Sequence, residues 1–241
     1  MSKCKDDWLR YVLYSLVKDC EKQGDLLRNN LAFVTFNYDV SLENRIFRGL
    51  ESNERIPNED KIEFYNRKNL VSHVYGSVRR NGFENTQFGD FFLLDTSFGS
   101  NDSPKAKNAK ICLDKAWSAA QSIFTIPQKK SANEDVLKIA KETISRAQTV
   151  YILGYGFDTT NSELINLKDL AVSSAESPAI HREVYFTNYG NSNRVNKSAG
   201  LLLVDDGNIF LESFMAPMTL TQGSYCEKST KNVYDALAYD F

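Results

Sequence analysis

Residues that form covalent or metal cross-links are scarce in this sequence. Its 241 residues include 4 cysteines and 2 histidines. The cysteines lie far apart, at Cys4, Cys20, Cys112 and Cys226. No C-x-x-C pair exists, and the histidines, His73 and His181, add no ligand at the close spacing that a structural zinc site needs. We therefore expect no metal and four reduced thiols, buried or partly buried.

The sequence also lacks long apolar runs and an excess of either charge. No run approaches the roughly 18 residues of a membrane span, and the first segment, MSKCKDDW, has no apolar stretch of the signal-peptide kind. The formal net charge is −2, which argues against a protein that holds nucleic acid or anionic membrane by bulk charge. With 42% hydrophobic residues and only 5 prolines, the composition is not that of a disordered chain. We expect a soluble, cytoplasmic, globular protein.

The first part of the chain predicts alternating helices and strands. Apolar residues at helical spacing over residues 5–22 predict an amphipathic helix. The short apolar segment Leu31–Phe36 suits a buried strand, and Asp39 is a good N-cap for a helix that follows it. Val71–Tyr75 (VSHVY) is predicted to be a second strand, closed by Gly76.

The second half repeats this alternation. A capping box from Ser131 to Glu134 predicts the start of a helix, and a second box, Thr160 to Glu163, predicts a helix over residues 161–173. The other predicted elements are strands at Thr149–Leu153 and Glu183–Thr187 and helices over 191–203 and 231–241. The pattern predicts a single α/β domain over residues 1–241, with a mainly parallel sheet and helices on both faces. Residues 77–132 are expected to be a loop and helical insertion.

Three predicted strands end in a polar residue or glycine: Asn37, Gly154 and Asn188. The carboxyl ends of parallel strands share one edge of a sheet, where helix N-termini favour anions. A small-molecule site for a phosphate-bearing ligand is therefore expected there. The alternative is that these residues only form turns and caps. Gly154–Thr159 begins like G-x-G-x-x-G but has Thr159 in place of the third glycine, so the dinucleotide fingerprint is incomplete.

The two histidines differ in context. His73 alternates with Tyr75 in VSHVY, so both are expected on one face of the strand. A histidine near a strand end can act as a general base, and it can equally be a hydrogen-bonded structural residue. His181 is expected on a surface loop. The sequence contains no G-x-S-x-G, H-E-x-x-H or Walker motif, which leaves serine hydrolase, zincin and P-loop functions without support.

Four segments, in order, resemble the sirtuin-type (SIR2) Rossmann family, and its bacterial anti-phage defence branch in particular. They are Phe33–Glu43 (FVTFNYDVSLE), Val71–Val78 (VSHVYGSV), Val150–Thr160 (VYILGYGFDTT) and Val184–Val195 (VYFTNYGNSNRV). The first resembles the family's T-x-N-x-D turn, and the second its His-Gly strand end. The third looks like the segment that holds the adenosine side of NAD, and the fourth like the strand whose terminal Asn meets the adenine ribose.

The resemblance implies a fold and an activity. The fold would be SIR2-like, and the activity would be hydrolysis of NAD to nicotinamide and ADP-ribose by a defence effector. Asn37 would orient the water or the ribose, with His73 and Tyr75 as the other catalytic candidates. The residues expected at the bound NAD are Thr35, Phe36, Asp39, Gly76, Gly154, Tyr155, Gly156 and Asn188. NAD is the only cofactor expected, as a substrate, and no metal is expected.

The chain also departs from the family pattern. A helix is predicted where the family has its Gly-rich first strand and phosphate loop, Tyr75 stands at the position of the catalytic histidine, and Gly156 replaces a serine. No C-x-x-C zinc module lies between Gly76 and Gly154, which argues against a protein deacetylase. The alternative function is therefore a catalytically inactive module that binds a nucleotide or a protein partner. A missing first strand also predicts an open strand edge and hence a homo-oligomer or a partner chain.

Overall fold

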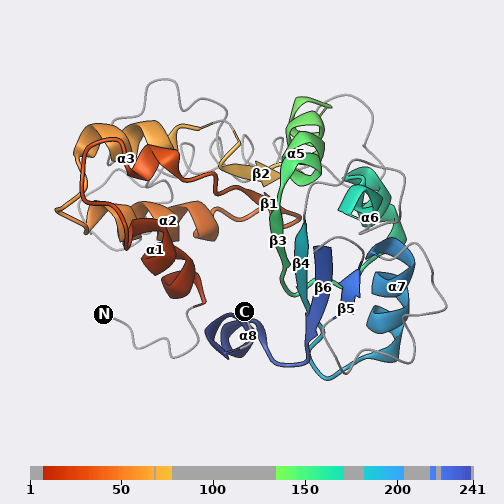
Figure 1. Ribbon diagram of the computed structural model, residues 1–241. Coiled ribbons are helices and arrows are strands. Elements are labelled where there is room, and N and C mark those ends of the chain that lie inside the picture. The colour runs from red at the N-terminus through yellow and green to blue at the C-terminus, as the bar shows by residue number, and fades with distance from the viewer. Residues whose placement is uncertain are drawn as a thin grey trace, which may run out of the picture. The chain divides into compact units, whose positions relative to one another are not determined.

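The computed structural model describes residues 8–67, 69–77, 134–170, 182–203, 218–220 and 224–239. These residues form a mixed α/β structure with parallel strands in two sheets (Figure 1). The chain divides into two compact units. We call Leu13–Val136 the amino-terminal unit, and Leu137–Phe241 with Met1–Val12 the carboxyl-terminal unit. The prediction of a single domain over residues 1–241 stays a prediction.

The amino-terminal unit contains one pair of parallel strands, β1 (Phe33–Thr35) and β2 (Val71–His73). Thr35 lies opposite His73 in the register, so both strands end at the same level. The helical elements of this unit are α1 (Leu9–Val17, from Leu13 on), η1 (Leu26–Arg28), α2 (Ser41–Glu51) and α3 (Asn58–Tyr65). Helices α2 and α3 form the connection from β1 to β2.

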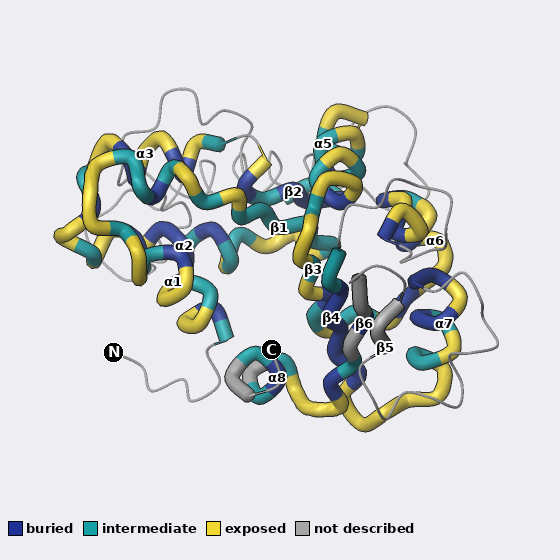
Figure 2. The backbone as a smooth tube through the Cα atoms, in the orientation of Figure 1, coloured by how far each residue is buried: buried dark blue, intermediate teal, exposed yellow. Residues whose placement is uncertain are grey.

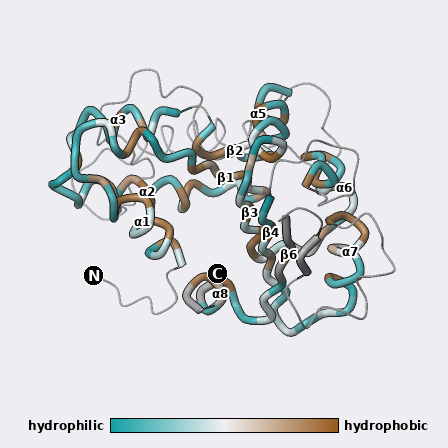
Figure 3. Tube along the Cα trace, viewed as in Figure 1, coloured by the Kyte–Doolittle hydropathy of each residue, from teal (hydrophilic) through white to brown (hydrophobic). Residues whose placement is uncertain are grey.

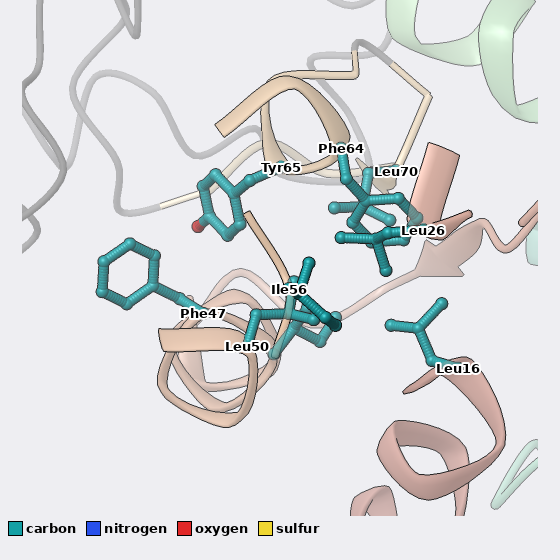
Figure 4. Close-up of a cluster of buried hydrophobic side chains, with 9 residues drawn as sticks. Leu16, Leu26, Phe47, Leu50, Ile56, Phe64, Tyr65 and Leu70 are labelled. Carbon is teal, nitrogen blue, oxygen red and sulfur yellow. The ribbon is translucent and has the colours of Figure 1, made fainter. Parts of the chain in front are cut away.

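One hydrophobic core holds these elements together. It consists of Leu16, Leu26, Ile46, Phe47, Leu50, Ile56, Phe64, Tyr65 and Leu70 (Figure 4). Leu13 of α1 and Phe33 of β1 are partly buried against the same core. The rings of Phe47 and Tyr65 meet edge-on, with their centroids 5.5 Å apart, which fixes α2 against α3. The predicted amphipathic helix therefore packs against the first strand through a shared core.

The carboxyl-terminal unit contains a sheet with the strand order β3-β4-β6-β5. Strands β3 (Thr149–Ile152), β4 (Glu183–Thr187) and β6 (Ser224–Ser229) are parallel, and β5 (Met218–Leu220) is antiparallel to β6. Strand β4 lies between two parallel neighbours, and four of its five residues are buried (Figure 2). A continuous apolar run such as VYF is typical of a central parallel strand.

Helices in this unit alternate with the strands in sequence. They are α5 (Glu134–Arg146, from Leu137 on), α6 (Thr159–Leu164), η3 (Leu167–Leu170), α7 (Asn193–Leu203) and α8 (Val233–Tyr239). Helix α7 is polar at its start and apolar at its end (Figure 3). Its buried residues are Ala199, Gly200, Leu202 and Leu203. No helix among the described residues is long and apolar enough to cross a membrane.

Several predicted elements are confirmed. The strands at 31–36, 149–153 and 183–187 are β1, β3 and β4, and the helices predicted over 5–22, 191–203 and 231–241 contain α1, α7 and α8. A helix does begin at Glu134, although Ser131 itself lies outside the described residues. Also outside them are His181, nearly all of the predicted insertion at 77–132, Cys4 and Cys112. Of the cysteines that are described, neither Cys20 nor Cys226 is in a disulfide.

Three predictions about local boundaries are wrong. The N-cap of α6 is Asp158, whose carboxylate accepts the N–H of Asn161 at 3.0 Å, and not Thr160. Helix α6 ends at Leu164, because Asn166 adopts a left-handed φ of 52°. Asp39 lies just before the N-cap position of α2, which Val40 occupies.

A fourth error concerns the second strand. Strand β2 ends at His73 and does not continue to Tyr75. The N–H of Gly76 donates to the carbonyl of His73 at 3.0 Å, so the chain turns immediately after the histidine. Gly76 has a φ of 77°, a conformation that glycine adopts without strain. The prediction that His73 and Tyr75 lie on one face of this strand is therefore wrong. His73 itself is the residue at the strand end.

Candidate functional site

His73 is the last residue of β2 and is only 8% exposed. It lies opposite Thr35, where β1 ends and the TFNYD segment begins. The carboxyl ends of parallel strands are the usual place for ligand-binding groups in α/β proteins. The predicted residues of this segment and of the β2 end therefore meet at one end of the β1-β2 pair.

Both ring nitrogens of His73 have partners. Nε2 lies 2.7 Å from Oε1 of Glu43, and Nδ1 lies 2.6 Å from the carbonyl oxygen of Asn37. Glu43 stands in the first turn of α2 and is 3% exposed. One imidazole from β2 thus joins the loop after β1 to the start of the helix that follows it.

The identity of the two partners determines where the protons lie. A carbonyl oxygen only accepts, so Nδ1 carries a proton and donates it to Asn37. Between Nε2 and the carboxyl of Glu43 one further proton is shared, on the imidazolium or on the carboxylic acid. Either assignment gives the pair no net charge, which suits its burial. His73 can accept a proton from a ligand only after its ring leaves one of these partners.

Asn37 is an exposed residue whose main chain is fixed by hydrogen bonds. Its N–H donates to Oγ1 of Thr35 at 3.1 Å, and its carbonyl accepts from His73. The residue itself is exposed, as are Tyr38 and Asp39 after it. The main chain at Asn37 is therefore held from both sides while the residue stays accessible to a ligand.

Asp39 is an anchored carboxylate in the same loop. Its Oδ1 accepts the N–H of Ser41 at 3.0 Å. The hydrogen bond from the Ser41 hydroxyl does most to lower the pKa of Asp39, with smaller lowering from the Ser41 N–H and from His73 nearby, while partial burial opposes the shift. Asp39 is therefore negatively charged at neutral pH.

Tyr75 and Phe36 form an aromatic contact beyond the strand ends. Their ring centroids are 5.7 Å apart and the rings are tilted by 49°. Both residues are partly buried. This contact holds the turn after β2 against the segment after β1, which brings Tyr75 and Gly76 to the same end of the strands as Asn37.

The predicted nucleotide segment after β3 is a tight turn. Gly154 has a φ of 62° and donates its N–H to Oγ1 of Thr187, the last residue of β4, at 2.9 Å. A Cβ on Gly156 would have no atom within 4 Å, so the space beside this backbone is open. The hydroxyl of Tyr155 lies 3.0 Å from Oγ of Ser162 on α6.

Asn188 serves the turn that follows β4. It is 3% exposed, its Oδ1 accepts the N–H of Ser192 at 3.1 Å, and its Nδ2 donates to Oδ1 of Asn196 at 2.7 Å. Nδ2 also donates to the carbonyl of Ser192 at 3.0 Å. Its carboxamide thus stabilises the start of α7, as the turn alternative describes. The role of Asn188 at a bound nucleotide stays a prediction.

The predicted site residues fall into two groups. Thr35, Phe36, Asn37, Asp39, His73, Tyr75 and Gly76 lie in the amino-terminal unit; Gly154, Tyr155, Gly156 and Asn188 lie in the carboxyl-terminal unit. Sequence analysis missed Glu43, which shares the buried side of α2 with Ile46, Phe47 and Leu50. A carboxylate at helical spacing within an apolar stripe was the signal that could have found it.

No protein-family model, no curated protein and no solved structure matches the chain. Among the residues that the structure describes, no cluster of three or more His, Cys, Asp or Glu could hold a metal ion.

Proposed function

We propose that this chain is a SIR2-like protein with a Rossmann-like α/β fold, which binds NAD and hydrolyses its nicotinamide–ribose bond as a bacterial anti-phage defence effector. One observation carries the proposal. The TFNYD loop lies at the carboxyl ends of two parallel strands, and a buried His73–Glu43 pair fixes the main chain of Asn37 there. Packing alone does not require such a pair, because apolar side chains of similar size would fill the same space.

The loop supplies groups that this reaction needs. Cleavage of the nicotinamide–ribose bond passes through a ribosyl cation, so the site needs a positioned carboxamide and negative charge nearby. Asn37 provides the carboxamide from a fixed backbone. Asp39, two residues further on, provides a carboxylate whose lowered pKa keeps it ionised. In this proposal Asn37 orients the water or the ribose, and Asp39 stabilises the developing positive charge.

In this proposal His73 does not begin the reaction as a free base, because both of its ring nitrogens already have partners. With Nε2 against Glu43 and Nδ1 against Asn37, it first acts by holding the loop. Its role as a base, and that of the Tyr75 hydroxyl, stay predictions. The role of the turn from Gly154 to Gly156 at the adenosine side of NAD stays a prediction.

A second candidate function is a nucleotide-binding module without catalysis. The occupied ring nitrogens of His73 favour it, since no other histidine is described near these strand ends. Tyr75, at the position where the family has its catalytic histidine, favours it too.

One pair of measurements distinguishes the two functions. Purified full-length protein is incubated with NAD, and nicotinamide and ADP-ribose are quantified by chromatography; NAD binding is measured by calorimetry on the same sample. Release of both products supports the hydrolase. Binding without products supports the second function, and the absence of both overturns the two together.

A further inference from the structure

Glu43 is an unexpected residue on its helix. It lies on the side of α2 that also carries Ile46, Phe47 and Leu50, and it is 3% exposed. Burial of a carboxyl group is unfavourable unless the group is paired and hydrogen-bonded. A leucine at this position would bury more apolar area, so the glutamate serves a purpose other than packing.

The loop between β1 and α2 has few buried contacts of its own. Asn37, Tyr38, Asp39 and Ser41 are all exposed. Polar contacts therefore hold its shape: the bond from Asn37 to Thr35, the bond from Ser41 to Asp39, and the bond from His73 to the Asn37 carbonyl. Of these, the bond from His73 connects the loop to a buried residue of another strand.

The orientation of the His73 ring depends on Glu43. A neutral imidazole carries its proton on either nitrogen, and only the form with Nδ1–H donates to Asn37. The carboxyl group of Glu43 shares a proton with Nε2, and this interaction leaves Nδ1 protonated in either charge state. Partners of this kind are known to fix the tautomer and ring orientation of histidines.

We propose that Glu43 is a positioning residue for Asn37: by holding the His73 ring with Nδ1–H toward the Asn37 carbonyl, it fixes the loop that carries the reacting carboxamide. This inference rests on the proposed function, in which Asn37 acts on the substrate. Glu43 itself touches no substrate. Its effect passes through one imidazole to the main chain of Asn37.

Two substitutions and a control test this role. Glu43→Leu keeps the volume and removes the partner of Nε2. Glu43→Gln keeps a partner, because its amide can donate to Nε2 while Nδ1 donates to Asn37. Glu51→Leu changes an exposed glutamate at the end of the same helix and serves as the matched control. We expect Glu43→Leu to lower kcat by about 100-fold, the scale of a misplaced reacting group, with KM little changed. Glu43→Gln is expected to retain most of the activity, and Glu51→Leu all of it.

A measurement on the ring itself does not depend on activity. The chain has 2 histidines, so ¹⁵N-histidine labelling gives two sets of ring signals, which a His73→Gln variant assigns. We expect Nδ1 of His73 to be protonated near neutral pH in the wild type and in Glu43→Gln. In Glu43→Leu we expect Nδ1 no longer to be held in the protonated form. An unprotonated Nδ1 in the wild type overturns the inference, as does a Glu43→Leu variant with unchanged ring signals and kcat. If the wild type neither binds nor cleaves NAD, the proposed function fails, and the ring signals still decide the role of Glu43.

Discussion

The carbonyl oxygen of Asn37 lies 2.6 Å from Nδ1 of His73, although the two residues are 36 positions apart in the sequence. This contact ties the loop after β1 to the end of β2. The two residues have different roles in the candidate site: the buried imidazole orients the main chain, and the exposed asparagine faces the solvent. The following predictions test these two roles and the packing that supports them.

Asn37→Ala is expected to abolish NAD cleavage and to leave folding nearly unchanged. The substitution keeps both main-chain hydrogen bonds of the residue and removes only its carboxamide. Substitutions at exposed positions usually change stability by no more than about 0.5 kcal/mol. Product release and the melting temperature are measured together, with Asn58→Ala, an exposed asparagine on α3, as the control. A large fall in melting temperature would make Asn37 a turn residue.

His73→Ala is expected to lower both activity and stability. Loss of a general base or of the positioning contact reduces the rate by about 100-fold or more. Removal of one partner of a buried pair destabilises a protein by about 3–5 kcal/mol, because Glu43 would remain buried without the imidazole. Initial rates and urea unfolding check the two effects.

Tyr75→Phe is compared with His73→Ala to decide which side chain acts as a base. It keeps the ring contact with Phe36 and removes only the hydroxyl. Activity that survives in His73→Ala but not in Tyr75→Phe would move the catalytic role to the phenol. Activity that survives in both would leave neither side chain as a base.

The elements of this chain are predictable where the signal is local. The apolar run of β4 and the apolar spacing of α1 and α2 are complete within a few residues, and the structure has them where the sequence predicts. Strand β6 was missed, because SYCEKS has neither an apolar run nor a clean alternation. Its place beside β4 depends on tertiary pairing and not on local preference.

The contact that defines the candidate site could not be predicted in the same way. Glu43 and His73 are 30 positions apart, and they meet only because β1 pairs in parallel with β2 in the register that places Thr35 opposite His73. No local pattern encodes this register. The early end of β2, which separates His73 from Tyr75, likewise follows from the turn that Gly76 closes.

Asp39→Asn is expected to change how stability depends on pH. The pKa of Asp39 is lower in the folded protein than its usual value, so the ionised carboxylate favours folding. This contribution is fully present above the unfolded value of about 3.9 and is lost as the pH falls through the folded-state value. Urea unfolding near neutral pH should show the variant to be less stable, with a difference that shrinks in acid. A difference that is constant with pH would contradict the prediction; Glu51→Gln is the control.

Gly49→Ala tests the close approach of α1 to α2. A Cβ on Gly49 would lie 2.5 Å from Cδ1 of Leu13, closer than two carbon atoms can pack. Overpacking costs about 1–3 kcal/mol, and alanine gains about 1 kcal/mol over glycine in a helix. We therefore expect a net loss of stability of about 1 kcal/mol in the wild-type background. In a Leu13→Ala background the same substitution should become stabilising, and a double-mutant cycle measures this coupling. Equal effects in both backgrounds would show that the two residues are independent.

Self-association of the chain is the last prediction, and it concerns the edges of the β1-β2 pair. Among the described residues, this sheet contains only two strands. Parallel strands usually lie within larger, covered sheets, and an open edge is a template for pairing with another chain. On α1, which packs against β1 through the common core, Tyr14 is 67% exposed. We expect dimers or larger species at micromolar concentration in light scattering, and weaker association in Tyr14→Asp. Tyr189→Asp, which changes an exposed tyrosine in the carboxyl-terminal unit, should leave association intact. A clean monomer over the whole concentration range would mean that the edges of this sheet are closed within the chain itself.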